Sequence, residues 1–157
     1  MGRMRVRMAV GCGMLFAAAV AQAPQRKAGL WELTTTMTML PASAMVTAPQ
    51  TFTSTAPVCF PQAMIDKYGA IMPSTQPGCK IENLVVKPGH MTADMVCTGA
   101  TVGKASLESS WTDPEHATGS IHFVGTIGGH DVEWTTYTKA AFKSADCGVL
   151  KTPPLPK

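Results

Sequence analysis

The chain has 157 residues, of which 45% are hydrophobic and 15% charged, a length and composition that suit one globular domain. Its formal charge of +3 comes from Arg3, Arg5 and Arg7, because the other ten basic residues are balanced by ten acidic ones. A neutral domain lacks the basic surface that binds nucleic acid and the polybasic segment that binds an anionic membrane. We therefore expect no nucleic-acid partner.

Residues 1–23 follow the plan of a secretory signal peptide. The three arginines form a positive n-region, and residues 8–20 form an apolar stretch that is too short to span a bilayer, which needs about 20 residues. Small residues follow and offer two cleavage sites. Cleavage after Ala21 is favoured, since cleavage after Ala23 would leave Pro24 at the start of the mature chain.

The chain divides into a leader, one domain and a tail. We expect a signal peptide at residues 1–21, a single β domain at 22–149 and a disordered, proline-rich tail at 150–157. The mature protein is then periplasmic or extracellular. No other apolar run is long enough for a transmembrane segment.

Apolar and polar residues alternate along much of the domain, which is typical of half-buried strands. In residues 31–39, tryptophan, leucine and methionine side chains share one face and threonines fill most of the other. Residues 61–69 begin with proline and end with glycine, the pattern of a short helix. Strands are predicted at residues 31–39, 52–59, 79–86, 90–97, 102–112, 117–127 and 131–142.

These elements indicate a mostly β fold. The glycine pair at 128–129 is a strong signal for a hairpin turn and pairs Phe123 with Trp134. Matching the apolar faces also pairs Leu107 with Ile121. A meander of about seven strands and one short helix has to curl to bury one face, so we expect a strongly curved antiparallel sheet or an open barrel.

Four cysteines remain once the leader is removed: Cys59, Cys79, Cys97 and Cys147. An even number of cysteines in an exported protein indicates disulfides. The alternative is a four-cysteine zinc site, but the spacing contains no C-x-x-C pair, which is the usual arrangement in such sites.

One disulfide pairing follows from the predicted hairpin at residues 79–97. A three-residue loop centred on Pro88 pairs Val86 with His90, and the same register places Cys79 opposite Cys97. A directly opposed pair of strand residues is close enough for a disulfide at a non-hydrogen-bonded position. The two remaining cysteines would then pair with each other. A bulge at the turn glycine would shift this register by one residue.

At residues 27–36 the chain reads KAGLWELTTT, and its start resembles a widespread family of small exported bacterial proteins. That family is known only as a domain of unknown function and opens with Pro-Gly-Leu-Trp-Glu, whereas Ala28 stands here in place of the proline. The likeness continues around all four cysteines and covers nearly all of the mature chain. The resemblance implies export and a β-rich fold, and it supplies no reaction, ligand or catalytic residue.

The Gly29-Leu30-Trp31 segment also resembles the Gly-x-Trp opening of lipocalin-like barrels. In such barrels the tryptophan closes one end, so the resemblance implies a structural role for Trp31.

The mature chain is rich in methionine, and methionine-lined cores adapt well to apolar ligands.

Histidines and methionines supply the candidate metal ligands. His90 and His116 lie near turns at the same end of the predicted meander, although histidines at turns are most often simply solvated. Met37 and Met39 could bind copper(I), since thioether ligands select that ion, but both lie on the predicted core face of their strand.

No catalytic motif is present in the sequence. It contains no Gly-x-Ser-x-Gly elbow and no phosphate-binding loop, and oxidised cysteines could not act as nucleophiles. The composition therefore favours a non-enzymatic periplasmic binding or structural module without a cofactor, with an apolar small molecule as its possible ligand. The alternatives are a periplasmic metal-handling protein that uses histidine or methionine side chains, and an enzyme of unrecognised type.

Overall fold

The computed structural model describes residues 25–41, 48–68 and 77–153. The predicted signal peptide, with both possible cleavage sites, lies outside these residues, as does the end of the predicted tail. The described elements are β1 (Gly29–Leu40), β2 (Gln50–Phe60), α1 (Gln62–Tyr68), β3 (Cys79–Lys87), β4 (His90–Thr98), β5 (Thr101–Ser110), β6 (His116–Ile127) and β7 (His130–Ser144).

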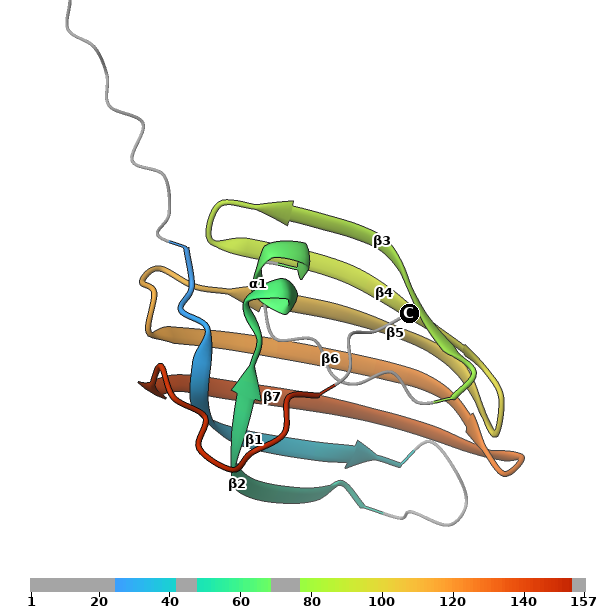
Figure 1. The fold of residues 1–157 in the computed structure, drawn as a ribbon. Helices are drawn as coiled ribbons and strands as arrows, with labels where there is room; N and C mark the ends of the chain where they lie inside the picture. The colour runs from blue at the N-terminus through green and yellow to red at the C-terminus, as the bar shows by residue number, and fades with distance from the viewer. Residues whose placement is uncertain (1–24, 42–47, 69–76, 154–157) are drawn as a thin grey trace, which may run out of the picture.

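The seven strands form one antiparallel sheet in the order β2-β1-β7-β6-β5-β4-β3. Each strand from β3 to β7 pairs with the next strand in the sequence, and β1 then pairs with both β7 and β2. The sheet is strongly curved and stays open, with β2 and β3 at its two edges (Figure 1). The predicted antiparallel meander of about seven strands, strongly curved and with one short helix, is confirmed.

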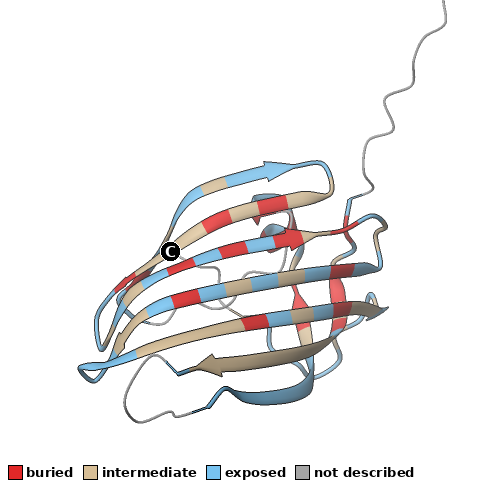
Figure 2. Cartoon of the chain, turned by 180° about the vertical axis from the view of Figure 1, so that it is seen from behind, coloured by how far each residue is buried: buried red, intermediate tan, exposed pale blue. Residues whose placement is uncertain are grey.

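The core lies between the sheet and α1. The short helix packs against one face of the sheet, here called the inner face, and buries Met64 and Tyr68 there (Figure 1). Buried residues alternate with exposed ones along β5 and β6, as expected for strands with one covered face (Figure 2). The largest fully buried side chains are Trp31, Phe123, Met64 and Met91.

Two directly opposed glycines make room for the Phe123 ring. A Cβ atom at Gly103 or Gly125 would come within 3 Å of that ring, and Gly103 also has a positive φ of 157°. The ring stacks on Trp134 at a centroid distance of 5.3 Å. The predicted pairing of Phe123 with Trp134 is thus confirmed, as is that of Leu107 with Ile121.

The β3–β4 hairpin confirms one predicted pair and corrects another. Cys79 lies opposite Cys97 as predicted, but Val86 pairs with Met91 rather than with His90. The turn has two residues between paired strand ends instead of three. A β-bulge between Glu82 and Val85 absorbs the difference, and within it Asn83 adopts a positive φ of 51°.

Several strand ends differ from the predicted ones. The strand predicted at residues 102–112 ends at Ser110, because Trp111 leaves the ladder to β6 and donates its backbone N–H to Gly89 O at 2.8 Å. The predicted helix begins after Pro61, whose carbonyl accepts a hydrogen bond from Met64 N.

In the described part of the chain, no helix has both the length and the apolar character that a membrane span requires.

Candidate functional site

The curvature of the sheet leaves a cavity of about 230 Å³ on its inner face. Strands β1, β4, β5, β6 and β7 each contribute to its wall, which brings together residues that lie far apart in the sequence. Most of the surface of this wall is apolar, because these strands turn their apolar faces inward. The aliphatic lining residues are Leu33, Met91, Leu107, Ala117, Ile121 and Ala140.

Six hydroxyl residues are among those that line the cavity, and four of them, Thr35, Ser109, Thr136 and Thr138, lie at inner-face positions, where three have partners. Thr35 and Thr138 bond to each other through their Oγ1 atoms at 3.2 Å, and Ser109 Oγ donates to Thr118 O at 3.1 Å. The Thr136 hydroxyl is buried and has no hydrogen-bond partner. A buried hydroxyl without a partner is unfavourable, so a ligand that displaces the atoms covering this group would supply a hydrogen bond that it lacks.

Arg26 and two tryptophans pack together near the start of β1. The Arg26 guanidinium lies 4.5 Å from the centroid of the Trp31 ring and 5.9 Å from that of Trp111. The side chain is 4% exposed, and none of its nitrogen atoms has a hydrogen-bond partner. Burial lowers its pKa to about 10, because desolvation disfavours the charged form.

Among the described residues, no carboxylate accepts a hydrogen bond from Arg26, and three acidic residues form ion pairs with other groups. Glu115 pairs with Lys27, Asp113 with His116, and Glu32 with Lys143. Contacts with the two aromatic rings are therefore the interactions that stabilise this buried cation.

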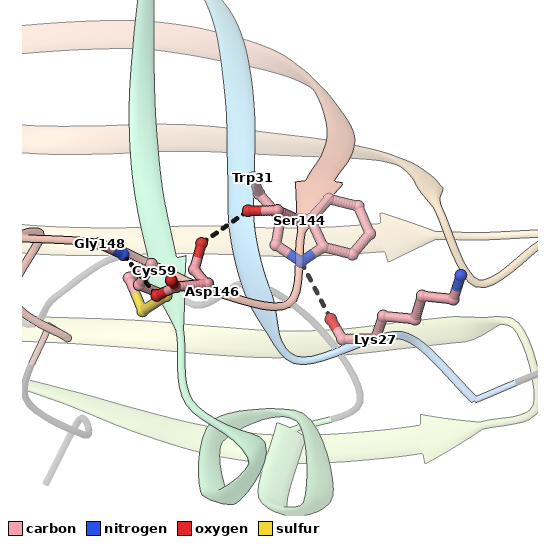
Figure 3. Close-up of a disulfide and its surroundings, with 7 residues drawn as sticks. Lys27, Trp31, Cys59, Ser144, Asp146 and Gly148 are labelled. Carbon is pink, nitrogen blue, oxygen red and sulfur yellow. Dashed lines mark hydrogen bonds between the residues drawn. A yellow bond between two sulfur atoms is a disulfide. The ribbon is translucent and has the colours of Figure 1, made fainter.

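The Trp31 ring closes this end of the molecule. It is fully buried and makes edge contacts with Phe60 and Phe142. Its Nε1–H donates to Lys27 O at 3.0 Å, which satisfies the one polar atom of the ring (Figure 3).

A disulfide between Cys59 and Cys147 fastens the same end. It joins the end of β2 to the segment that follows β7, with the Cα atoms 5.5 Å apart (Figure 3). Asp146 orders that segment, because its carboxylate accepts a hydrogen bond from Gly148 N at 2.8 Å and its carbonyl accepts one from Ser144 Oγ. Both predicted disulfides are present, since Cys79 and Cys97 are also bonded to each other.

A larger groove of about 420 Å³ reaches the outer face of the sheet. Glu32, His116 and Lys139 contribute to its wall, and Glu32 forms an exposed ion pair with Lys143. Charged groups on an exposed surface are hydrated and interact weakly. The inner-face cavity is smaller but more enclosed, and its wall contains the Thr136 hydroxyl, so it is better suited to a specific ligand.

The candidate metal ligands do not converge in the part of the chain that the structure describes. His90 contacts Ser110 Oγ at 3.1 Å, and His116 contacts its own turn through Asp113. Met37 and Met39 lie on β1, and their neighbours across the strands include Phe52 and Trp134. Among the described residues, no three His, Cys, Asp or Glu side chains form a group that could hold a metal ion.

Sequence reasoning missed the two most informative polar residues. Thr136 occupies an inner-face position among Trp134, Thr138 and Ala140, and the period-two alternation of β7 could have identified it. Arg26 precedes the first strand, and no sequence pattern indicated that it would be buried between two rings.

The fold and the cavity define a class of protein: an open, disulfide-bonded antiparallel β meander with one helix on its inner face. The model of a family described as protein of unknown function (DUF3617) matches residues 26–147, and the chain belongs to this family. The match includes all seven strands, both disulfides and Arg26. The resemblance to an uncharacterised domain family is confirmed. A search of curated proteins and a search of solved structures each found no match.

Proposed function

We propose that this protein is an exported, non-enzymatic module that binds a small apolar molecule in the inner-face cavity. The observation that carries the proposal is the hydroxyl of Thr136, which has no hydrogen-bond partner in a wall whose surface is mostly apolar. Ligand pockets commonly combine an apolar lining with a few polar groups that orient the ligand. The ligand is therefore expected to be mainly hydrocarbon with one hydroxyl or carbonyl group.

The size of the cavity limits the ligand. Its volume of about 230 Å³ is below the roughly 300 Å³ at which typical ligand pockets begin. A bicyclic aromatic compound or a short aliphatic chain is thus a better candidate than a large lipid.

A non-enzymatic role is favoured by the kind of polar groups in the cavity. Serine and threonine hydroxyls are weak acids and need a neighbouring base to act as nucleophiles. Among the described lining residues, Glu108 is the ionisable one, and its side chain is 58% exposed and 3.8 Å from His90.

Export is supported by the leader-like sequence of residues 1–23, and fractionation of the producing cells tests it.

Two small probes test the binding proposal: naphthalene, and 2-naphthol, which adds one hydroxyl. Both should bind, and their own fluorescence reports the binding. Ala140→Leu places extra atoms in the cavity and should weaken both probes about ten-fold or more, since overpacking costs about 1–3 kcal/mol. Ala141→Leu makes the same change one residue further on, toward the other face, and should leave binding unchanged. Equal losses in both variants, or no binding to the wild-type protein, would refute the proposal.

The Thr136 hydroxyl is tested by Thr136→Val, which keeps the volume of the side chain. The variant should bind 2-naphthol about five-fold more weakly, because one hydrogen bond of about 1 kcal/mol is lost. Naphthalene forms no such bond and should bind as before. A parallel loss for both probes would show that the hydroxyl does not recognise the ligand.

A further inference from the structure

The two edges of the open sheet differ in how well they are protected from pairing with another strand. Edge strands expose unpaired N–H and C=O groups, and proteins usually block them with charges or bulges. At the β3 edge, Lys80, Glu82 and Lys87 are charged and the bulge at Asn83 interrupts the ladder. The β2 edge has no charged residue, and residues 50–57 are all exposed (Figure 2).

The prolines of this segment show which backbone groups face away from the sheet. Pro57 has no N–H, and a proline within a sheet is tolerated where that position faces away from the neighbouring strand. Successive residues of an antiparallel strand direct their N–H and C=O groups to alternate sides. Thr51, Thr53 and Thr55 therefore also direct theirs outward, and are free to pair with another strand.

Side-chain contacts between β1 and β2 agree with this orientation. Threonines of β2 face threonines of β1 with Oγ1 atoms 3.1–3.2 Å apart. Side chains approach most closely at the non-hydrogen-bonded positions of an antiparallel pair. The β2 threonines therefore use their backbone groups on the opposite side. The three pairs are Thr34–Thr55, Thr36–Thr53 and Thr38–Thr51.

We propose that β2 pairs with β2 of a second copy of this chain, antiparallel, about a two-fold axis at Thr53. Pro49 and Pro57 lie the same number of residues before and after Thr53, so this register brings a proline to each end of the paired segment. Between them, Thr51 lies opposite Thr55 of the second copy, and the two Thr53 residues face each other. A two-fold interface has to be self-complementary in this way.

The side chains fit the same register on both faces of the sheet. On the outer face, threonine lies opposite threonine across the axis, here at hydrogen-bonded positions, and such cross-strand pairs are stabilising. On the inner face, Phe52 lies opposite the small Ser54 of the second copy. Phe52 is 55% exposed in the single chain, so pairing would also cover an apolar ring.

Charged variants at the axis test this arrangement in the full mature chain. Sedimentation equilibrium of the wild-type protein should show a dimer that dissociates on dilution. In Thr53→Lys and Thr53→Glu, like charges would face each other, so each variant alone should dimerise about five-fold more weakly or worse. A mixture of the two should recover the dimer, because opposite charges then meet.

Position 86 on the other edge provides the matched control. Val86 is 45% exposed on β3, and Val86→Lys should leave the dimer unchanged. Position 53 is fully exposed, so circular dichroism should show folded protein for every variant. A wild-type chain that stays monomeric at its highest soluble concentration would overturn the proposal. So would a dimer that Thr53→Lys leaves intact, or one that the mixture does not restore.

Discussion

Burial and ring contact act in opposite directions on the Arg26 side chain. Lowering its pKa from the ordinary value of an arginine to about 10 corresponds to roughly 3 kcal/mol of unfavourable desolvation at neutral pH. Two cation–π contacts offset part of this, each worth about 0.5–2 kcal/mol. Arginine suits the position better than lysine would, because a guanidinium is more weakly hydrated and stacks on rings.

Substitutions at Arg26 should therefore separate charge from packing. Arg26→Met keeps most of the buried volume without the charge, and should be as stable as the wild type or about 1 kcal/mol more stable. Arg26→Lys keeps the charge but hydrates more strongly, so it should be the less stable variant. Urea unfolding measures both. If Arg26→Met is the more damaging change, then the guanidinium has a partner that stabilises it, such as a bound anion.

Asp113 shapes the turn between β5 and β6. Its carboxylate accepts hydrogen bonds from the backbone N–H groups of Glu115 and His116, each at 2.7 Å, and lies near the His116 ring. These contacts lower the pKa of Asp113, and the bond from Glu115 contributes most. A carboxyl group with a lowered pKa stabilises the fold above its ordinary pKa, and this contribution is lost as the pH falls through the folded-state value.

Asp113→Ala should consequently lower the urea midpoint at pH 7, and the difference from the wild type should shrink in acid. Most of the change should occur below the ordinary value of 3.8, where the unfolded chain binds the proton first. Asp113→Asn keeps an oxygen acceptor without the charge, so its midpoint should lie between the other two at pH 7. A difference that is the same at pH 7 and at pH 2 would show that the ionised carboxylate is not responsible.

Among the elements, the β3–β4 hairpin shows how far a sequence can define the fold. Alternation and the two cysteines correctly placed Cys79 opposite Cys97, because a one-residue slip would turn the whole strand over. The predicted three-residue turn was wrong, because the observed turn has two residues. The bulge at Asn83 shifts the register by one residue, so that Cys79 still lies opposite Cys97. A bulge leaves little signal in a sequence when its residue is asparagine rather than glycine.

The candidate site was less predictable than the strands. Period-two patterns identify which residues face inward, but the cavity depends on how far the sheet curls and on which small residues meet. Ala117 and Ala140 come from β6 and β7 and pair with each other, next to Leu33 on β1. Whether these three residues meet depends on two registers at once, β6 with β7 and β1 with β7, and an error of one residue in either of them separates the three residues.

Substitutions at Asn83 test the bulge. Asn83 has a positive φ, which asparagine tolerates and a β-branched residue does not. Asn83→Val should lower the free energy of unfolding by about 1–3 kcal/mol, from backbone strain and from loss of the 2.7 Å hydrogen bond to Asp94. Asn83→Gly loses the same hydrogen bond without the strain and should be much less destabilised. Equal losses in the two variants would mean that the backbone conformation contributes nothing.

For the molecule as a whole, the two disulfides close loops of very different length. Cys79 and Cys97 are 18 residues apart and belong to neighbouring strands, whereas Cys59 and Cys147 are 88 residues apart and enclose most of the domain. A crosslink stabilises a fold mainly by restricting the unfolded chain, and the effect grows with loop length. The long-range disulfide is therefore expected to contribute more to stability, although the sheet itself already holds both segments in place.

Paired cysteine-to-alanine variants should show this order. Removing the Cys79–Cys97 bridge should lower the free energy of unfolding by about 3 kcal/mol, and removing the Cys59–Cys147 bridge by about 4–5 kcal/mol. Both variants should also unfold with a steeper urea dependence, because the uncrosslinked chain exposes more surface. If the short-range bridge has the larger effect, then its role lies in the folded hairpin, where it would hold the bulged register, and not in the entropy of the unfolded chain.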